Sequence, residues 1–245
     1  MFIKACLNGS RAAGEHPRLP LTPDELAADA VAVRRAGAGA VHVHPRDAAG
    51  RESLAATDVG AATSAIRAAA PGLPVGVSTG LWITGGDVPA RLDAVTAWAR
   101  LPAAARPDFA SVNLSEPGFG DLARALLEAG IGVEAGVWSP SDAATLTASG
   151  LAGRMTRILV EVIDAPSEEA VPRAAAVLDR LDGSPVPRLL HGEGPATWPL
   201  VTEAARLGLA TRIGREDTLL DPDGGPAEGN AALVRRALAE GRSAR

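Results

Sequence analysis

Residues 22–44 read TPDELAADAVAVRRAGAGAVHVH and contain the signals for a helix followed directly by a strand. Thr22 is suited to cap the helix, Pro23 suits its first position, and acidic residues follow in the first turn. Gly37 stands where a left-handed residue can end the helix. The run GAVHVH at 39–44 is short and largely apolar, as in a buried strand. We therefore predict one helix–strand unit here.

The same alternation repeats along the chain. We expect strands at 2–7, 39–44, 74–79, 109–114, 132–138, 157–163, 187–192 and 210–214. We expect helices at about 22–37, 57–70, 88–100, 119–129, 140–150, 167–181, 196–207 and 228–240. Alternating units of this kind predict parallel strands joined by crossover helices, and eight of them favour a closed (β/α)8 TIM barrel without exposed sheet edges. An open doubly wound sheet is the alternative.

Boundary signals recur elsewhere in the chain. Ser167, followed by two glutamates, resembles the helix start at Thr22 and predicts a second side-chain cap. Gly130 and Gly208 follow helical stretches, as Gly37 does, and are suited to the same left-handed position. Neither a linker nor a break in composition divides the chain, so we expect residues 1–245 to form one domain.

The composition and the net charge of the chain restrict the kinds of partner that it can bind. The chain of 245 residues is 47% hydrophobic and 22% charged, which is typical of a globular protein. A net charge of −5 gives no broad basic field, so we expect no nucleic-acid partner and no anionic membrane partner. The single cysteine, Cys6, excludes an internal disulfide. The N-terminus lacks a secretory signal pattern and no apolar run approaches ~20 residues, so we expect a soluble, cytoplasmic protein.

Polar and ionisable side chains gather at the ends of the predicted strands. They are His42, His44, Ser78, Thr79, Asn113, His191, Glu193, Arg212, Glu216 and Asp217, with Glu134 inside the fifth strand. In a barrel the carboxyl ends of all strands meet at the face that carries the active site. Trp82 and Trp138 follow two of these strands and are candidates to cover a substrate.

The His-x-His pair within 39–44 predicts a metal site. Because side chains alternate along a strand, His42 and His44 point to the same side. Two imidazoles and a carboxylate suit a divalent ion such as zinc with an open coordination position. One cysteine excludes a thiolate-rich zinc site, so Glu216, Glu134 or Glu193 would supply the third ligand. The alternative is a pair of histidines that are hydrogen-bonded within a polar barrel mouth.

A second cluster lies in TRIGRED, residues 211–217. It brings Arg212, Glu216 and Asp217 into one strand-to-loop turn. Adjacent carboxylates repel each other, and they are stabilised when one binds a cation and an arginine pairs with the other. A natural division places Glu216 on the metal and makes Asp217 a base. The alternative is a solvated cluster of surface charges.

Several motifs, in this order, resemble one known family, the β-keto acid cleavage enzymes. They are LNGSR, HPRLPLTPDELAADAVAVRRAGAGAVHVHPRD, VSTG, SVNLSEPG, VEAGVW, LLHGEG and TRIGREDTLL. The type member is the 3-keto-5-aminohexanoate cleavage enzyme, and this chain is similar to a short member. The most specific parts are the TPxE lead-in to His-x-His-x-Arg and the final Arg-x-Gly-x-Glu-Asp.

The resemblance implies a zinc-containing (β/α)8 barrel that forms a homo-oligomer, a dimer or a tetramer. Its reaction would condense a β-keto acid with acetyl-CoA to give acetoacetate and a new acyl-CoA. By the same resemblance, His42, His44 and Glu216 would bind Zn²⁺, Asp217 would be the general base and Arg212 its charge-pairing partner. The resemblance implies that Ser78, Ser111, Asn113 and Glu134 bind substrate, and we expect the same of Thr79, which ends the same strand as Ser78.

The chain departs from the type member near its N-terminus. The type member has a pocket glutamate, associated with the amino group of its substrate, where this chain has Arg11. An arginine in the substrate pocket would suit an acidic or uncharged acyl chain better. Glu15 folding back into the pocket is the alternative. Arg215 also replaces a residue that is usually apolar.

Two further functions remain open at this point. A zinc-bound enolate also serves a metal-dependent aldolase or lyase that acts without CoA. A ligand-binding barrel without catalysis is the other possibility, although the metal and base residues speak against it. Dependence of product formation on acetyl-CoA distinguishes the first reaction from the aldolase.

Overall fold

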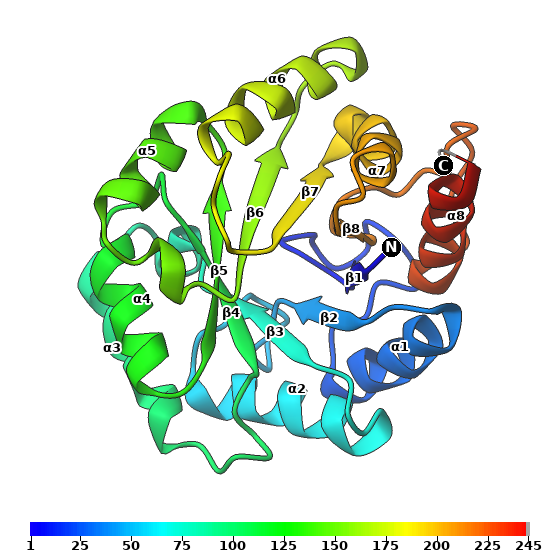
Figure 1. Cartoon of the computed structure of the whole chain (residues 1–245). Helices are drawn as coiled ribbons and strands as arrows, with labels where there is room; N and C mark the ends of the chain where they lie inside the picture. The colour runs from blue at the N-terminus through cyan, green and yellow to red at the C-terminus, as the bar shows by residue number, and fades with distance from the viewer. Residues whose placement is uncertain (244–245) are drawn as a thin grey trace.

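The computed structural model describes residues 1–243, and within them eight parallel strands form a nearly closed barrel (Figure 1). The strands are β1 (Ile3–Cys6), β2 (Ala40–Val43), β3 (Val75–Ser78), β4 (Phe109–Asn113), β5 (Gly132–Val137), β6 (Arg157–Val162), β7 (Arg188–Gly192) and β8 (Thr211–Ile213). From β1 to β7 each strand pairs with the next in sequence, and β1 also pairs with β8. Only an isolated bridge, Leu189 to Ala210, joins β7 to the segment before β8. The predicted TIM barrel is confirmed, and the open sheet is wrong.

Helices surround the strands on the outside of the barrel (Figure 1). They are α1 (Pro23–Ala36), α2 (Ala56–Ala69), α3 (Val88–Thr96), α4 (Phe119–Glu128), α5 (Pro140–Ala148), α6 (Ser167–Arg180), α7 (Thr197–Arg206) and α8 (Asn230–Ser243). Short 3₁₀ helices are η1 (Leu81–Thr84), η2 (Ala97–Arg100), η3 (Ala152–Arg154) and η4 (Gly194–Ala196). Every predicted helix is present. The helix expected at 88–100 tightens into η2 after Thr96, and α8 begins two residues later than expected.

The boundary signals of α1 work as expected. The hydroxyl of Thr22 accepts a hydrogen bond from the Glu25 amide at 3.3 Å, and the Glu25 carboxylate accepts one from the Thr22 amide at 2.9 Å. Gly37 ends the helix with a φ of 110°, which an L side chain rarely adopts. Gly130 and Gly208 also have left-handed φ values, 72° and 69°.

The cap predicted at Ser167 is wrong. Ser167 already lies in the first turn of α6, after Pro166, and no side chain caps this helix. The hydroxyl of Ser167 instead donates to the carbonyl of Pro195 at 2.9 Å, which ties α6 to the segment around η4. A tertiary contact has therefore replaced the local cap that the sequence pattern favoured.

Alternation along the strands separates an apolar shell from a polar barrel interior. Residues of one parity, such as Val41 and Val43, belong to the apolar cluster between sheet and helices. Residues of the other parity point inward and are buried although many are polar. These are Lys4, His42, Ser78, Asn113, Glu134, Glu161, His191 and Arg212, while Ser111 on the same side is half-buried. The barrel interior is thus lined with ionisable groups that need partners or ligands.

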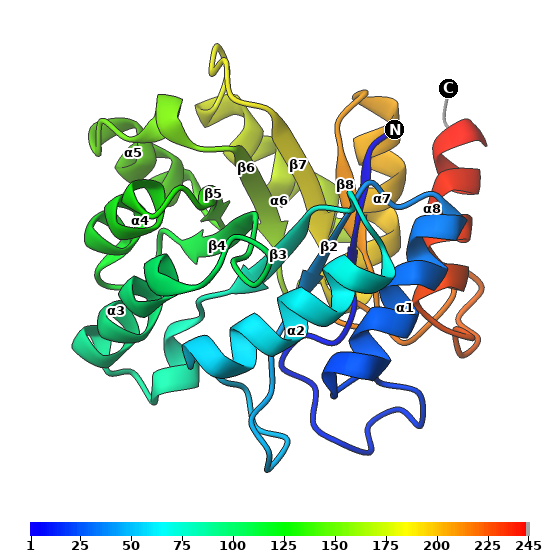
Figure 2. The same ribbon diagram turned by 90° about the horizontal axis from the view of Figure 1, so that it is seen from below.

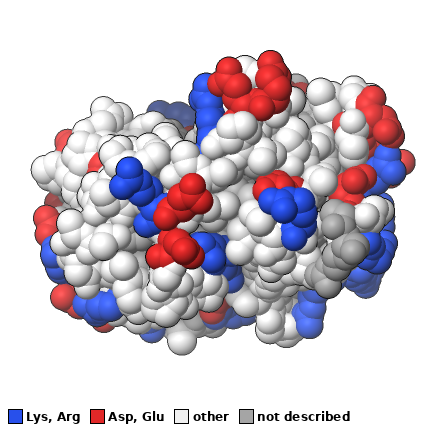
Figure 3. Space-filling view, turned by 45° about the horizontal axis from the view of Figure 1, so that its top comes forward, with Lys and Arg blue, Asp and Glu red and all other residues white. Residues whose placement is uncertain are grey.

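The loops that follow β1 and β2 project from the same side of the barrel, at its carboxyl-terminal mouth (Figure 2). On the face seen in Figure 3, Lys and Arg side chains are interspersed with Asp and Glu. Within residues 1–243, no helix combines the length and apolar character that crossing a bilayer requires. The carboxyl ends of the strands converge at this mouth, which is where TIM barrels carry their functional sites.

Candidate metal centre and active site

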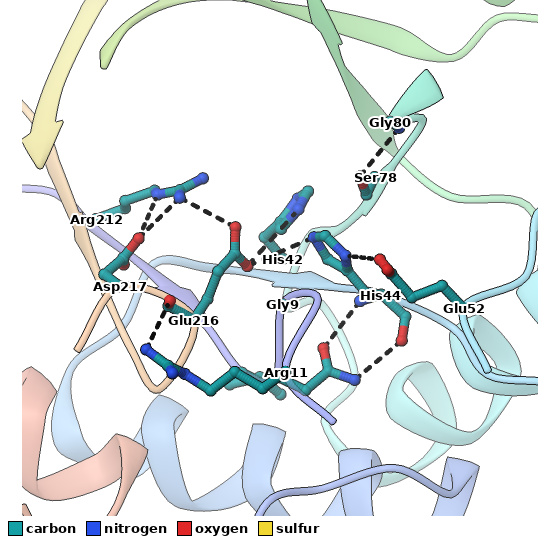
Figure 4. A network of polar contacts seen from close by, with 12 residues as sticks. Gly9, Arg11, His42, His44, Glu52, Ser78, Gly80, Arg212, Glu216 and Asp217 are labelled. Atoms are coloured by element: carbon teal, nitrogen blue, oxygen red, sulfur yellow. Dashed lines mark hydrogen bonds and ion pairs between the residues drawn. The ribbon is translucent and has the colours of Figure 1, made fainter. Parts of the chain in front are cut away.

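The two histidines of the second unit and one carboxylate from the turn after β8 meet at the mouth (Figure 4). Nε2 of His42 lies 3.9 Å, and Nε2 of His44 3.7 Å, from Oε2 of Glu216. One ligand atom from each of the three residues lies within 4.8 Å of the others. Of the carboxylates left open as third ligand, the structure therefore brings Glu216 to the histidines.

The separations at this triad fit a shared cation better than hydrogen bonds. They exceed hydrogen-bond lengths, whereas two ligands bound at 2.0–2.2 Å to one tetrahedral ion lie about 3.3–3.6 Å apart. Nδ1 of His42 and Oε2 of Glu216 are also buried without a hydrogen-bond partner in the described part of the chain. Two imidazole nitrogens and one carboxylate oxygen can therefore hold a divalent metal ion here.

The electrostatics of the triad agree with ligand roles. Burial holds the pKa of His42 well below its usual value, so the ring is neutral. Burial also lowers the pKa of His44, but the carboxylates of Glu216 and Glu52 outweigh it and raise that pKa to about 9. Burial would raise the pKa of Glu216, but Arg212 and the two histidines hold it well below its usual value. A metal ion would therefore displace a proton from His44.

Glu52, which sequence reasoning missed, orients His44. Its Oε1 lies 2.5 Å from Nδ1 of His44, and its Oε2 accepts a hydrogen bond from Nε1 of Trp82 at 2.9 Å. The Trp82 ring stacks beside His44, with centroids 6.3 Å apart. A carboxylate on the remote nitrogen of an imidazole fixes its tautomer and its direction. Glu52 lies in an irregular loop, and no periodic pattern marks it.

Replacing Glu52 with alanine is expected to weaken metal binding by about 10- to 100-fold, because His44 loses the group that orients it. Metal titration of the purified protein, followed by calorimetry, measures the effect. Asp47→Asn in the same loop is the matched control, since Asp47 contacts only its own turn and Arg51. Equal affinities for Glu52→Ala and Asp47→Asn would show that Glu52 does not support the metal site.

Arg212 joins the triad to a second carboxylate (Figure 4). Its Nε and Nη2 donate to Oδ1 of Asp217 at 2.9 and 2.7 Å, and Nη2 also lies 3.0 Å from Oε1 of Glu216. Oδ2 of Asp217 is buried without a hydrogen-bond partner among residues 1–243. Burial raises the pKa of Asp217 to about 7, with Arg212 opposing and Glu216 adding to the rise. A carboxylate with a free oxygen and a pKa near neutrality has the chemistry that proton exchange requires.

A cavity of about 250 Å³ opens beside the triad. Its walls combine the metal-site residues with polar strand-end residues and two tryptophans. They are Ser10, His42, His44, Ser78, Trp82, Ser111, Asn113, Trp138, Glu161, Ile163, Glu193, Arg212 and Glu216. The structure therefore brings three of the expected substrate-binding residues, Ser78, Ser111 and Asn113, to this cavity. Trp82 and Trp138 are partly exposed at its walls.

Comparison with known proteins supports an enzyme of one family. The family model for beta-keto acid cleavage enzymes matches residues 1–244 of the chain. The chain belongs to this family. This family member carries the histidine pair and the Arg-x-x-x-Glu-Asp turn at one site.

Solved structures share the fold of this family member. ObcA without ligand aligns with a TM-score of 0.74 and 22% identity, over 93% of this chain and 63% of that chain. A ternary complex of ObcA with a C4-CoA adduct and oxalate aligns with a TM-score of 0.76 and 21% identity, over 93% and 65%. The chain thus spans less than two thirds of ObcA. The 3-dehydroquinate dehydratase of Geobacillus kaustophilus HTA426 aligns with a TM-score of 0.64 and 14% identity, over 97% and 91%.

Two residues expected to bind substrate lie away from the cavity in this family member. Thr79 follows Ser78 and so points away from the cavity; its hydroxyl donates to the Ser111 carbonyl at 2.6 Å. The Arg11 guanidinium donates to the backbone carbonyls of Arg215 and Glu216 and does not line the cavity (Figure 4). Neither side chain therefore lies at the cavity in this structure, because both donate to backbone carbonyls. The hydrogen bonds of Arg11 instead stabilise the turn that carries Glu216.

Glu134 is not at the cavity either. It is fully buried inside the barrel, where its two carboxylate oxygens pair with Lys4 of β1 and Arg157 of β6. Its position on β5 lies two residues before Gly136, which is the level of Asn113. Lys4, which sequence reasoning missed, pairs with Glu134 below the cavity, so this carboxylate does not line the cavity wall. Lys4 was detectable as a charged residue within an apolar strand.

Removing the Glu134 carboxylate is expected to destabilise the fold. Glu134→Ala leaves the fully buried ammonium of Lys4 without its partner, which typically costs about 3–5 kcal/mol in the free energy of unfolding. Urea unfolding followed by circular dichroism measures the loss. Glu128→Ala, on the exposed end of α4, is the control and should change stability by less than about 0.5 kcal/mol. A loss below about 1 kcal/mol for Glu134→Ala would contradict a structural ion pair.

Proposed function

We propose that this chain is a zinc-dependent β-keto acid cleavage enzyme that condenses a β-keto acid with acetyl-CoA and releases acetoacetate and a new acyl-CoA. The observation that carries the proposal is the convergence of His42, His44, Glu216 and Arg212 on one small cavity, with Asp217 paired to Arg212 directly behind its wall. A group of side chains that could hold a metal ion, close to a carboxylate that could act as a base, supports this chemistry. Membership of the family supports the reaction class.

The residues present fit the metal that the reaction needs. Zn²⁺ accepts two imidazoles and one carboxylate and keeps a position open for a ligand. When bound by His42, His44 and Glu216, the ion would supply Lewis acidity toward the ketone and carboxylate oxygens of the substrate. Glu52 would hold His44 in the tautomer that leaves Nε2 free.

Asp217 would move the proton. Its unpartnered Oδ2 would remove a hydrogen from the carbon between the ketone and the carboxylate, while Oδ1 stays bound to Arg212. The carbanion attacks the thioester carbonyl of acetyl-CoA, and the CoA thiolate leaves. Arg212 would keep Asp217 oriented, and its positive charge would also balance the negative charge of Glu216.

The second half of the reaction uses the same groups. The CoA thiolate attacks the original ketone, the bond between that carbonyl and the central carbon breaks, and the acyl group leaves as its CoA thioester. The remaining carbanion is that of acetoacetate, and Asp217 returns the proton to it. Ser78 lines the cavity and would stand near the thioester. Complexes of ObcA with oxaloacetate and with a C4-CoA adduct and oxalate support keto acid and CoA ligands for this fold.

A panel of β-keto acids tests the proposal. Each acid is incubated with metal-loaded protein and acetyl-CoA, and the amounts of acetoacetate and of the new acyl-CoA are measured. The reaction predicts equal amounts of the two products. We expect at least one acid to give both products only when acetyl-CoA is present. Products formed equally well without acetyl-CoA would favour the aldolase or lyase, and silence across a broad panel would contradict the proposed reaction.

A further inference from the structure

A second pocket, of about 540 Å³, lies between α1 and α8. These two helices pack side by side on the outside of the barrel (Figure 1). The loop that follows β1 and the turn after β8 complete its walls, through Arg18 and Arg215. We call it the α1–α8 pocket. It shares no lining residue with the cavity beside the metal ligands, so a ligand bound in it would not occupy the metal site.

Arg215, in the wall of this pocket, is a buried cation without a counter-ion. Only 3% of the residue is exposed, and no carboxylate oxygen lies within 4.0 Å of its guanidinium in the described part of the chain. Nη1 and Nη2 donate to the uncharged backbone carbonyls of Arg18 and Glu228, and Nε has no partner among residues 1–243. A buried charge in this state gains free energy when an anion pairs with it. The position is usually apolar in the family, so a role common to the family does not explain this charge.

The first turn of α8 offers free backbone donors to the same pocket. The Leu233 amide is the first to bond backward, to the Gly229 carbonyl at 3.0 Å. The amides of Ala231 and Ala232, which line the pocket, have no acceptor among residues 1–243. Gly229, just before the helix, has no side chain that could cap them. The N-terminus of a helix of 14 residues also carries a partial positive charge, which favours an anion.

Two residues at the start of α8 keep Arg215 beside these amides. Oδ1 of Asn230 accepts a hydrogen bond from the Arg215 amide at 2.6 Å, and its Nδ2 donates to the Leu7 carbonyl at 2.8 Å. The Asn230 side chain is thus engaged with the barrel and does not cap the helix. A Cβ atom added to Gly229 would lie 2.8 Å from Nη2 of Arg215. The absence of a side chain at this glycine therefore lets the guanidinium lie against the start of the helix.

The acidic residues at the pocket have other partners or face solvent. Glu25 accepts two backbone amides in the cap of α1. Asp29 accepts a hydrogen bond from Nδ2 of Asn230 at 2.5 Å, and burial raises its pKa although Asn230 and Arg215 oppose the rise. Glu228 is exposed. None of these carboxylates is paired with a guanidinium of the pocket within 4.0 Å.

The exposed basic residues at the pocket are free. Arg18 and Arg235 lie at its surface and form no ion pair among residues 1–243. Burial lowers the pKa of the nearby His16, and Arg215 and Arg18 lower it further, with no carboxylate opposing them. The potential on this side of the pocket is therefore positive, although the net charge of the chain is −5.

We infer that the free amides of α8, together with Arg215, Arg18 and Arg235, bind a phosphate group in the α1–α8 pocket. A phosphate offers several charged acceptor oxygens, which suit backbone amides and guanidinium groups together. Phosphate sites in TIM barrels are often formed by the loops after the last strands and a helix N-terminus. Inorganic phosphate and the bisphosphate end of CoA share this chemistry, and the pocket is large enough for either. The inference does not depend on the proposed reaction.

Calorimetric titration of the metal-loaded protein tests the inference and distinguishes the two sources. The probes are inorganic phosphate and adenosine 3′,5′-bisphosphate. Tighter binding of the bisphosphate would indicate CoA as the source of the group. Equal or weaker binding of the bisphosphate would indicate free phosphate. Absence of binding by both probes at millimolar concentration would overturn the inference.

Variants of the arginines assign the binding to this pocket. Arg215→Leu removes the buried cation and should weaken phosphate binding by about 10- to 100-fold, the range of a hydrogen bond to a charged group. Arg18→Gln combined with Arg235→Gln removes two exposed cations and should weaken binding by about two- to tenfold. Arg236→Gln is the control, since Arg236 pairs with Asp223 and does not line the pocket.

His42→Ala separates this pocket from the metal site, because phosphate is also a ligand for a bound metal ion. The variant should keep the phosphate binding that Arg215→Leu loses, since the pocket shares no residue with the triad. Binding that is lost in His42→Ala but kept in a folded Arg215→Leu would overturn the inference. If Arg215→Leu does not fold, the double variant decides, because both of its side chains are exposed. An affinity equal to that of Arg236→Gln would then overturn the inference.

Discussion

Replacing Asp217 with asparagine is expected to lower turnover by about 10²- to 10⁴-fold, the usual range for the loss of a general base. An amide cannot take the proton from the keto acid, but it occupies almost the same volume beside Arg212. The triad of His42, His44 and Glu216 is left intact, so bound metal should remain close to the wild-type level.

Steady-state rates and metal content must therefore be measured on the same preparation of Asp217→Asn. Asp223→Asn is the matched control, since Asp223 is exposed and pairs only with Arg236. We expect the control to keep its turnover and its metal. Full turnover in Asp217→Asn would exclude Asp217 as the base, whereas loss of metal with turnover would show that the substitution disturbs Glu216 as well.

Replacing His42 with alanine is expected to empty the metal site and to abolish the reaction. His42 is buried and neutral, and one of its ring nitrogens completes the only group of three potential ligands found among residues 1–243. Loss of one of three protein ligands should weaken binding by more than the roughly 10- to 100-fold expected when a supporting residue is removed. Elemental analysis after dialysis against a metal-free buffer measures the occupancy.

His16→Ala is the control for this experiment. His16 lies in the loop after β1, and one of its ring nitrogens accepts a hydrogen bond from the Arg18 amide. The control should retain the wild-type metal content. Equal occupancy in His42→Ala and wild type would show that the metal ligands are assigned wrongly, whatever the effect of His42→Ala on turnover.

The positions of helices and strands could be predicted from local patterns. The sequence of α1 and β2 contains its own start, stop and periodicity, and the structure follows them to within about one residue. The convergence of His42 and His44 was predictable for the same reason, since the alternation of a strand determines the side on which each residue lies. The pairing of Arg212 with Asp217 was predictable as well, because the two residues are only five positions apart in the sequence.

Partners from distant strands could not be predicted in this way. Glu134 was expected to line the pocket, but in the barrel it pairs with Lys4, which reaches it from β1 on the opposite side. Arg11 was expected to contact the substrate, but in the structure its guanidinium donates to the backbone carbonyl of Glu216. Glu161 carried a signal, a charge inside an apolar strand, but only the barrel brought it beside His191 of β7 on the cavity wall.

The sequence by itself determined the order and type of the elements, the shared face of the two histidines and the cluster after the last strand, because each depends on residues that are neighbours along the chain. Only the tertiary structure decided which carboxylate joins the histidines, which charges neutralise each other inside the barrel and which oxygens remain free to meet a ligand. Those choices depend on strand order and register, which bring together residues more than a hundred positions apart.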